Sequence, residues 1–255
     1  RKLARRWYRN IVLACHAATL KVTRTPYADA ARCTADCARL MQLPLPNDKA
    51  QDGYDISKAI FRYQFGRRDL VMLLRHAGRK VAEAGMAPFA PEDLSQWDGL
   101  TPGSDVGALR HLSHQRGKDV DVSLYGQDGT APWRTYCTRR SVSGGRECVP
   151  GSMTNFDGAA NARAYAGYLQ SGRVTMSFLD RELIPSVVAG ARQGVDAGVI
   201  ARDLLPLYTD GRHLQHWPNH DNRIHMRLSE AAYETASADD GGTGTSVNPL
   251  EAFEA

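Results

Sequence analysis

Histidine is unevenly distributed along this 255-residue chain, and its placement indicates metal chemistry. Six of the eight histidines fall in two short windows: His111 and His114 in the first, and His213, His216, His220 and His225 in the second. Neutral imidazole is a favoured zinc ligand, and Asp121 adds a carboxylate seven residues after His114. Neither window contains a cysteine, so a structural Cys-rich zinc site is not expected.

These ligands need a turn and two strands to bring them to one point. Gly117 lies between His114 and Asp121 and predicts a turn that folds the chain back. Asp121 lies on the polar face of a predicted strand over 119–125, and His225 lies on the polar face of another over 222–228. The sequence therefore predicts zinc on His114, Asp121 and His225. Three protein ligands leave a fourth position open, which is typical of catalytic zinc.

The surrounding sequence predicts an α+β fold with a small antiparallel sheet that carries the zinc site and is flanked by helices. A third strand is expected over 173–179, with Val174, Met176 and Phe178 on its buried face. Residues 1–90 have a helical pattern, clearest over 69–84 with Gly85 as its stop, and further helices are expected over 158–170 and 180–193. We expect a helical N-terminal extension (1–54), a zinc domain (55–234) and a flexible tail (235–255).

Composition bounds the partners and the compartment. The balance of 32 basic and 28 acidic residues is too even to indicate nucleic acid, and the chain has no apolar run long enough for membrane insertion. Cys137 and Cys148 flank a Gly/Ser/Arg-rich stretch that is expected to be a loop with nothing apolar to order it, so we predict that they form a disulfide. Cys15, Cys33 and Cys37 leave an odd count; Cys15 could pair with either of the others, and five free buried cysteines are the alternative.

Two segments carry a family resemblance: HLSHQRGKDVDV at 111–122 and WPNHDNRIHMRL at 217–228. Together they resemble the penicillin-insensitive murein endopeptidases, which belong with the lysostaphin-type, D-Ala-D-Ala-type and hedgehog-like zinc domains. Weaker similarity in the same order extends it over about residues 55–230. The resemblance implies zinc on His114, Asp121 and His225, with His111 lining the site or binding metal secondarily. It also implies a periplasmic or secreted hydrolase that cuts D-alanyl–meso-diaminopimelyl cross-links between peptidoglycan peptides.

The sequence departs from this family at Arg223, where the family has the first histidine of a His-x-His pair. An arginine stays protonated and cannot be a general base, but it could stabilise an oxyanion from the same strand face as His225. His220, which matches the family's other active-site histidine, is then the acid/base candidate. Trp217 and His216 are candidates for the wall of a substrate cleft.

The leading hypothesis is therefore a zinc peptidase acting on peptidoglycan. One alternative is a D,D-carboxypeptidase or dipeptidase of the same group, which would differ in how the cleft is closed. The other is a zinc-containing cell-wall binding module whose catalytic function lapsed when arginine took position 223.

Overall fold

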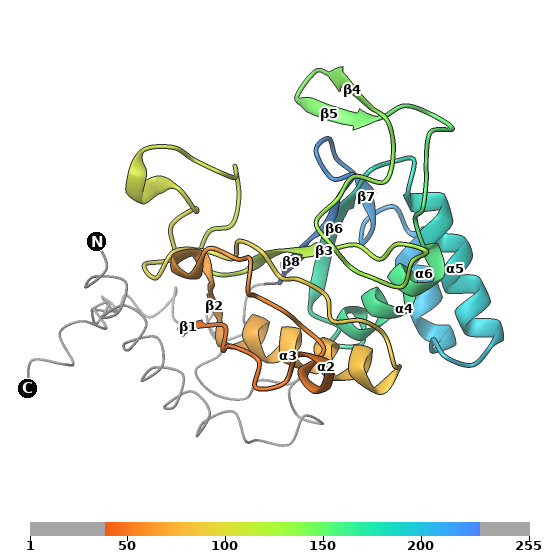
Figure 1. Cartoon of the computed structure of the whole chain (residues 1–255), viewed down its shortest axis with the longest axis horizontal. Coiled ribbons are helices and arrows are strands. Elements are labelled where there is room, and N and C mark those ends of the chain that lie inside the picture. The colour runs from red at the N-terminus through yellow and green to blue at the C-terminus, as the bar shows by residue number, and fades with distance from the viewer. Residues whose placement is uncertain (1–38, 230–255) are drawn as a thin grey trace, which may run out of the picture.

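The computed structural model describes residues 39–229. A four-stranded sheet runs in the order β3-β8-β6-β7, from Asp119–Ser123, Arg223–Leu228, Val174–Leu179 and Gln215–His216. Three longer helices, α3 (Arg68–Glu83), α4 (Gly158–Leu169) and α5 (Ile184–Asp196), pack against one another in the layer beside the sheet (Figure 1). This mixed arrangement of small sheets and helices agrees with the predicted α+β class.

The apolar faces of the predicted strands β3 and β8 form the core with the helices. Val120 and Val122 of β3, with Ile224 and Met226 of β8, belong to one buried cluster that includes helix residues such as Leu74. The two strands are antiparallel neighbours with Asp121 opposite His225. Since opposite residues of an antiparallel pair project to the same face, the pairing places both polar side chains on the face away from the helices.

The helices follow the sequence pattern closely. Helix α3 buries Leu70, Leu73 and Leu74, and the chain turns out of the helix at Gly85, which takes a φ of 67°. Helix α5 begins at Ile184, later than the predicted start at 180. Pro185 lies in its first turn, where the missing N–H of proline costs no helical hydrogen bond.

Strand β6 differs from its predicted pattern. The register between β6 and β8 shifts between Val174 and Met176, and Val174, Ser177 and Leu179 are the buried residues. A bulge moves the following side chains to the opposite face. The expectation that Met176 and Phe178 lie on the buried apolar face is therefore wrong.

Three other regions also correct the sequence analysis. The predicted helical stretch before residue 90 contains the antiparallel strands β1 (Leu40–Gln42) and β2 (Phe65–Arg67). A short helix α2 (Lys49–Asp52) and a 3-10 turn (Phe61–Tyr63) lie between them. The sheet is not wholly antiparallel, because β7 runs parallel to β6. The stretch between Cys137 and Cys148 is not a loop but the hairpin β4–β5 (Arg139–Val142 and Gly145–Cys148). The remaining helix, α6, spans Leu205–Thr209.

The predicted bridge between Cys137 and Cys148 is confirmed, with Cα atoms 5.5 Å apart. The expected tail over 235–255, most of the N-terminal extension, and Cys15, Cys33 and Cys37 lie outside the described residues. Leu43 and Tyr54, which belong to the expected N-terminal extension (1–54), pack in the same core as α3. Within residues 39–229, no helix is long and apolar enough to cross a membrane.

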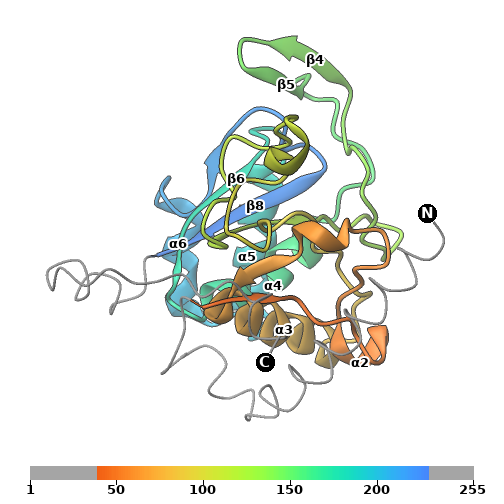
Figure 2. The same ribbon diagram turned by 90° about the vertical axis from the view of Figure 1, so that its left-hand side faces the viewer.

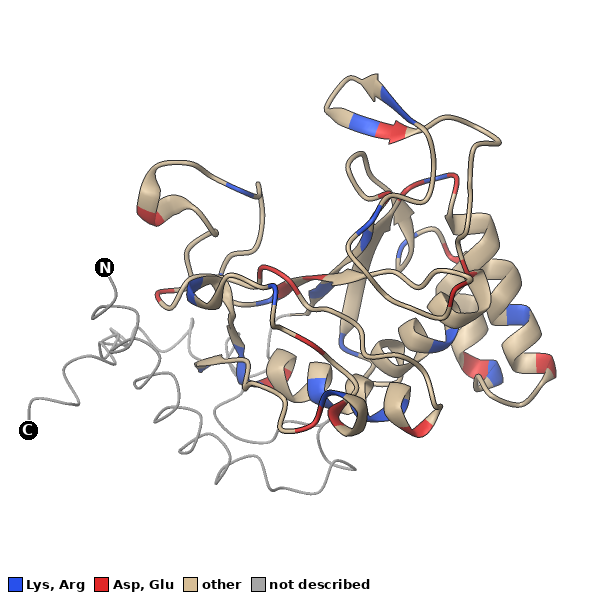
Figure 3. Ribbon diagram, viewed as in Figure 1, with Lys and Arg blue, Asp and Glu red and all other residues tan. Residues whose placement is uncertain are grey.

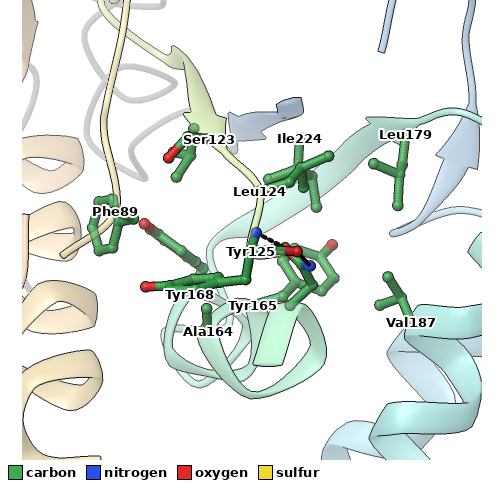
Figure 4. A pocket seen from close by; sticks show the side chains of 12 residues that line it. Phe89, Ser123, Leu124, Tyr125, Ala164, Tyr165, Tyr168, Leu179, Val187 and Ile224 are labelled. Carbon is green, nitrogen blue, oxygen red and sulfur yellow. Dashed lines mark hydrogen bonds between the residues drawn. The ribbon is translucent and has the colours of Figure 1, made fainter. Parts of the chain in front are cut away.

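A small cavity lies on the helix side of the sheet, between β3, β6 and α4 (Figure 4). Its walls are mostly apolar and aromatic side chains, with Tyr125, Tyr165 and Tyr168 among them. The histidine and aspartate cluster described below lies on the other face of the sheet, so this cavity is a feature of the core.

Candidate metal centre

The pairing of three strands places a row of side chains across the polar face of the sheet. His225 on β8 lies opposite Asp121 on β3 and opposite Phe178 on β6. His225 and Asp121 are almost fully buried, although they are polar and lie on the face away from the helices. Buried polar groups need partners, and the partners here come from the neighbouring strands and from the loops that cover this face.

His114 reaches the row from the turn before β3. His114 and Arg116 take positive φ values of 67° and 56°, and Gly117 follows with 63°. A side chain at Gly117 would place its Cβ 2.5 Å from the backbone nitrogen of Arg67, so glycine is required there. Positive φ at a residue other than glycine is uncommon and concentrates at functional sites. The predicted glycine turn is present, and it delivers His114 to the sheet.

The nitrogen and oxygen atoms of the predicted ligands converge. His114 Nε2 lies 3.1 Å from His225 Nδ1, and Asp121 Oδ1 lies 3.0 Å from His225 Nδ1 and 3.5 Å from His114 Nε2. Ligand atoms of a tetrahedral zinc with bonds of about 2.0–2.1 Å stand roughly 3.3–3.4 Å apart. The three spacings therefore fit a common metal ion.

Both imidazoles are oriented by a hydrogen bond from the ring nitrogen that faces away from the others. His114 Nδ1 donates to the carbonyl oxygen of Leu94 at 3.0 Å, since a carbonyl can only accept. His225 Nε2 donates to Asp119 Oδ1 at 3.1 Å, since a carboxylate can only accept. Such bonds from carbonyls and carboxylates are the usual outer partners of metal-binding histidines.

This hydrogen bonding leaves three electron pairs facing one another. With their other nitrogens donating, neutral His114 and His225 each present a bare nitrogen to the other and to the Asp121 carboxylate. Bare acceptors at these distances repel unless a proton on His225 Nδ1 or a metal cation lies between them. The donor set of two imidazoles and one carboxylate suits zinc, so the residues present fit the metal that the sequence predicts.

The electrostatics of the cluster also favour a bound cation. Burial disfavours a charged imidazole, but hydrogen bonds to Asp119 and Asp121 outweigh it and raise the pKa of His225 to about 9. Burial likewise disfavours the charged form of Asp121, but the charges of His114 and Arg223 outweigh it and hold its pKa well below the usual range. Surroundings that keep a buried carboxylate ionised and attract a proton to His225 also attract a metal ion.

His111 borders the cluster from the side of the 96–113 loop. Its ring stacks on His114 with centroids 4.0 Å apart, and its Nδ1 lies 3.6 Å from Asp121 Oδ2. Its Nε2 lies 3.0 Å from Asp93 Oδ2, which also accepts from Arg110. Within residues 39–229, His111, His114 and Asp121 form a group whose ligand atoms all lie within 4.8 Å of one another. His111 is thus placed to line the site or to bind metal.

His220 completes the second such group, with Asp121 and His225. Its Nδ1 lies 2.8 Å from the carbonyl oxygen of Pro218 and 3.2 Å from that of Trp217, so Nδ1 donates and Nε2 is the basic nitrogen. Burial lowers the pKa of His220 to about 4, with the Asp121 charge opposing the shift. The ring is therefore neutral at physiological pH, with a free electron pair on Nε2.

Arg223 extends along the same face of β8 and contacts the far oxygen of Asp121. Its Nε lies 2.9 Å from Asp121 Oδ2, as an ion pair without hydrogen-bond alignment, and its Nη1 donates to Asn222 Oδ1 at 3.0 Å. The guanidinium is partly exposed, with a side-chain exposure of 22%. It can donate to a ligand from this position while it balances the charge of Asp121.

The remaining residues named from the sequence lie at different distances from the cluster. Trp217 is half exposed and packs on Phe178 with ring centroids 5.2 Å apart, so it borders the site. His216 faces another cluster, where its Nδ1 accepts from Arg181 N and its Nε2 lies 3.3 Å from Glu147 Oε2. His213 pairs with Asp210 at the end of α6.

Sequence reasoning missed three residues that shape the site. Asp119 orients His225, Asp93 orients His111, and Phe178 stacks on His225 and packs against His220. Asp119 could have been found, because it lies two residues before Asp121 on the same strand face. Asp93 lies in a loop, and Phe178 reaches the site through the bulge, so neither has a sequence signal.

Comparison with known proteins gives no match: no protein-family model and no curated protein sequence matches the chain.

Proposed function

We propose that this chain is a zinc-dependent peptidoglycan endopeptidase, periplasmic or secreted, that hydrolyses D-alanyl–meso-diaminopimelyl cross-links. One observation carries the proposal: the buried convergence of His114, Asp121 and His225, with both imidazoles oriented from behind. The family resemblance of the two histidine windows supplies the substrate class, and the disulfide suits an oxidising compartment.

His114, Asp121 and His225 would hold the zinc, and His111 would line the site or bind metal secondarily. Zinc bound there would act as a Lewis acid on the scissile carbonyl and lower the pKa of a water molecule for attack. The chain's own residues then have to move a proton and stabilise charge on the substrate oxygen.

His220 is the residue that can take the proton. Its Nδ1–H is held by the backbone carbonyls of Trp217 and Pro218, so the basic Nε2 keeps one tautomer and one orientation. A ring nitrogen of His220 lies within 4.8 Å of ligand atoms of Asp121 and His225. We assign His220 the proton transfer from the attacking water to the leaving amine.

Arg223 is assigned to the charge that develops on the substrate oxygen. It carries a permanent charge, is partly exposed, and is held beside the cluster by Asp121. Trp217, exposed at the border of the site, is assigned to the wall that contacts the peptide. His216 contacts Glu147 and accepts a hydrogen bond from Arg181 N. We therefore assign it to the support of that wall.

The alternative of a lapsed binding module has one observation in its favour: Arg223 Nε is engaged with Asp121 rather than free. A single assay separates the readings. Purified sacculi are incubated with zinc-loaded protein, chelator-treated protein and the His220→Ala variant, and the soluble products are identified by mass spectrometry.

If the protein is the proposed endopeptidase, we expect cross-linked dimers to become monomers, with one water added at each cut. This conversion should require both zinc and an intact His220. Release of free D-alanine without loss of dimers would instead show a carboxypeptidase. Co-sedimentation with sacculi without any product would show a binding module, and would refute the proposed hydrolysis.

A further inference from the structure

The hairpin β4–β5 stands away from the helical layer, beside the end of the sheet that carries β7 (Figures 1 and 2). The residues of β4 are mostly exposed, and both strands of the hairpin carry arginines, at Arg139 and Arg140 on β4 and Arg146 on β5 (Figure 3, blue). An isolated two-stranded hairpin is marginally stable in water. The disulfide between Cys137 and Cys148 closes its base. Contacts with two other segments, residues 216–221 and 180–181, hold the hairpin in place.

The first set of contacts joins the hairpin turn to Asn219. Asn219 N donates to the Arg146 carbonyl at 2.7 Å, and its Oδ1 accepts from Arg146 N at 2.9 Å. Asn219 takes a positive φ of 65°, and a Cβ at Gly145 would lie 2.2 Å from its side chain. The turn and Asn219 therefore fit closely, one residue before His220.

The second set joins the base of the hairpin to Asp221 and, through Asp180, to the carbonyl oxygen of His220. Arg139 Nε donates to Asp221 Oδ2 at 2.6 Å, and Asp221 is fully buried. Cys148 N donates to Asp180 Oδ2 at 2.9 Å, and Asp180 N donates to the His220 carbonyl at 2.9 Å. Asp180 therefore links Cys148 of the disulfide to His220 through two hydrogen bonds.

From these contacts we infer that the disulfide-closed hairpin positions His220, so that catalysis requires the Cys137–Cys148 bond. Arg139 and Asp221 are positioning residues: they act through the His220 backbone and do not touch the cluster. The inference rests on the proposed function of His220, but not on the identity of the substrate. The metal ligands lie on β3, β8 and the turn at His114, outside the segment that the hairpin holds.

Reduction of the bridge removes the covalent link between the two arms, which are then joined only by the β4–β5 strand pairing and polar contacts such as Arg140 with Glu147. Two electrons and two protons convert the disulfide to the thiols of Cys137 and Cys148; in the assay a water-soluble phosphine supplies the electrons and becomes its oxide, with water as the source of oxygen and protons. Without the bond, the exposed β4 strand has little to keep Arg139 on Asp221. A displacement of about 1 Å at a catalytic group can cost on the order of 10² in rate.

The test compares oxidised and phosphine-reduced protein, both zinc-loaded, on a cross-linked muropeptide. We expect reduction to lower kcat by about 10²-fold, with little change in KM or zinc content, and reoxidation to restore the rate. Arg139→Ala should reproduce most of the loss and Arg139→Lys should recover part of it. Arg146→Ala is the matched control, because it removes an arginine from the same hairpin while the contacts of Arg146 with Asn219 are made by its backbone N and O.

A second measurement does not depend on activity. The imidazole carbon–proton NMR signals of His220, assigned with His220→Gln, should shift or broaden on reduction, while those of His114 and His225 stay in place. If wild type cleaves nothing but the His220 signals move, the positioning inference stands and the proposed function falls. If the reduced, zinc-loaded protein keeps the oxidised rate, or the His220 signals are unchanged, the inference is overturned.

Discussion

Asp119 offers a test of the metal centre that does not require a substrate. Its Oδ1 accepts from His225 Nε2 at 3.1 Å and from Arg227 Nε at 2.7 Å, whereas Oδ2 has no hydrogen-bond partner among residues 39–229. In Asp119→Asn, the amide nitrogen can take the place of Oδ2, so both hydrogen bonds survive and only the negative charge is lost. In Asp119→Ala, the acceptor is lost as well.

Loss of an outer partner of a metal-binding histidine typically weakens metal binding by about 10–100-fold, or about 1.4–2.8 kcal/mol. We expect zinc affinity to fall by about 10-fold in Asp119→Asn, because His225 keeps its orientation. In Asp119→Ala we expect it to fall by about 100-fold. Zinc affinity would be measured by competition with a chromogenic chelator at fixed pH and ionic strength.

A matched control separates this effect from the general cost of disturbing a buried carboxylate. Asp69 is also buried and pairs with Arg67 and Arg173, so Asp69→Asn should lower thermal stability and leave zinc affinity unchanged. Wild-type affinity in both Asp119 variants would refute the orienting role of Asp119. Equal loss in Asp69→Asn would show that the effect is not local.

Three further outcomes are expected. His114→Ala should lose both zinc, measured by elemental analysis, and cleavage; full zinc content in this variant would remove His114 from the ligand set. Arg223→Ala should lower kcat by about 10²–10³-fold with zinc affinity nearly unchanged, and Arg223→His should not raise the rate; a silent Arg223→Ala would favour the binding module. Tyr168→Phe should leave the free energy of unfolding in urea unchanged or raise it by up to about 1 kcal/mol, because the buried Tyr168 hydroxyl has no hydrogen-bond partner in the described chain. A decrease in this free energy would instead reveal a partner such as an ordered water.

The sequence was sufficient for the parts of the fold that depend on simple periodicity. Leu70, Leu73 and Leu74 repeat at helical spacing and are buried on α3, and alternation on β3 and β8 correctly put Asp121 and His225 on one face. No alternation rule anticipates a bulge, so Phe178 was assigned to the wrong face of β6. Because a one-residue shift reverses every following side chain, this error concealed an aromatic neighbour of His225.

The hairpin could not be predicted for a different reason. Its strands carry almost no apolar pattern, and its position is set by Arg146 and Arg139, which bind Asn219 and Asp221 more than seventy residues later. Polar contacts between distant segments leave no periodic signal in a single sequence. The disulfide was predictable because two cysteines flanking a segment without a core have an evident use.

The two oxygens of Asp121 show how Arg223 can lie beside the cluster without blocking a metal ion. Oδ1 lies 3.0 Å and 3.5 Å from the bare nitrogens of His225 and His114, whereas Oδ2 lies 2.9 Å from Arg223 Nε. The metal-facing oxygen and the arginine-facing oxygen are different atoms, so Arg223 does not occupy the position that a zinc ion needs. Since the guanidinium cannot accept a proton, this arrangement leaves proton transfer to His220, whose tautomer is fixed by the carbonyls of Trp217 and Pro218. In the proposed enzyme, the position of His220, and with it the hairpin that holds its loop, therefore matters more than in a site with two basic histidines.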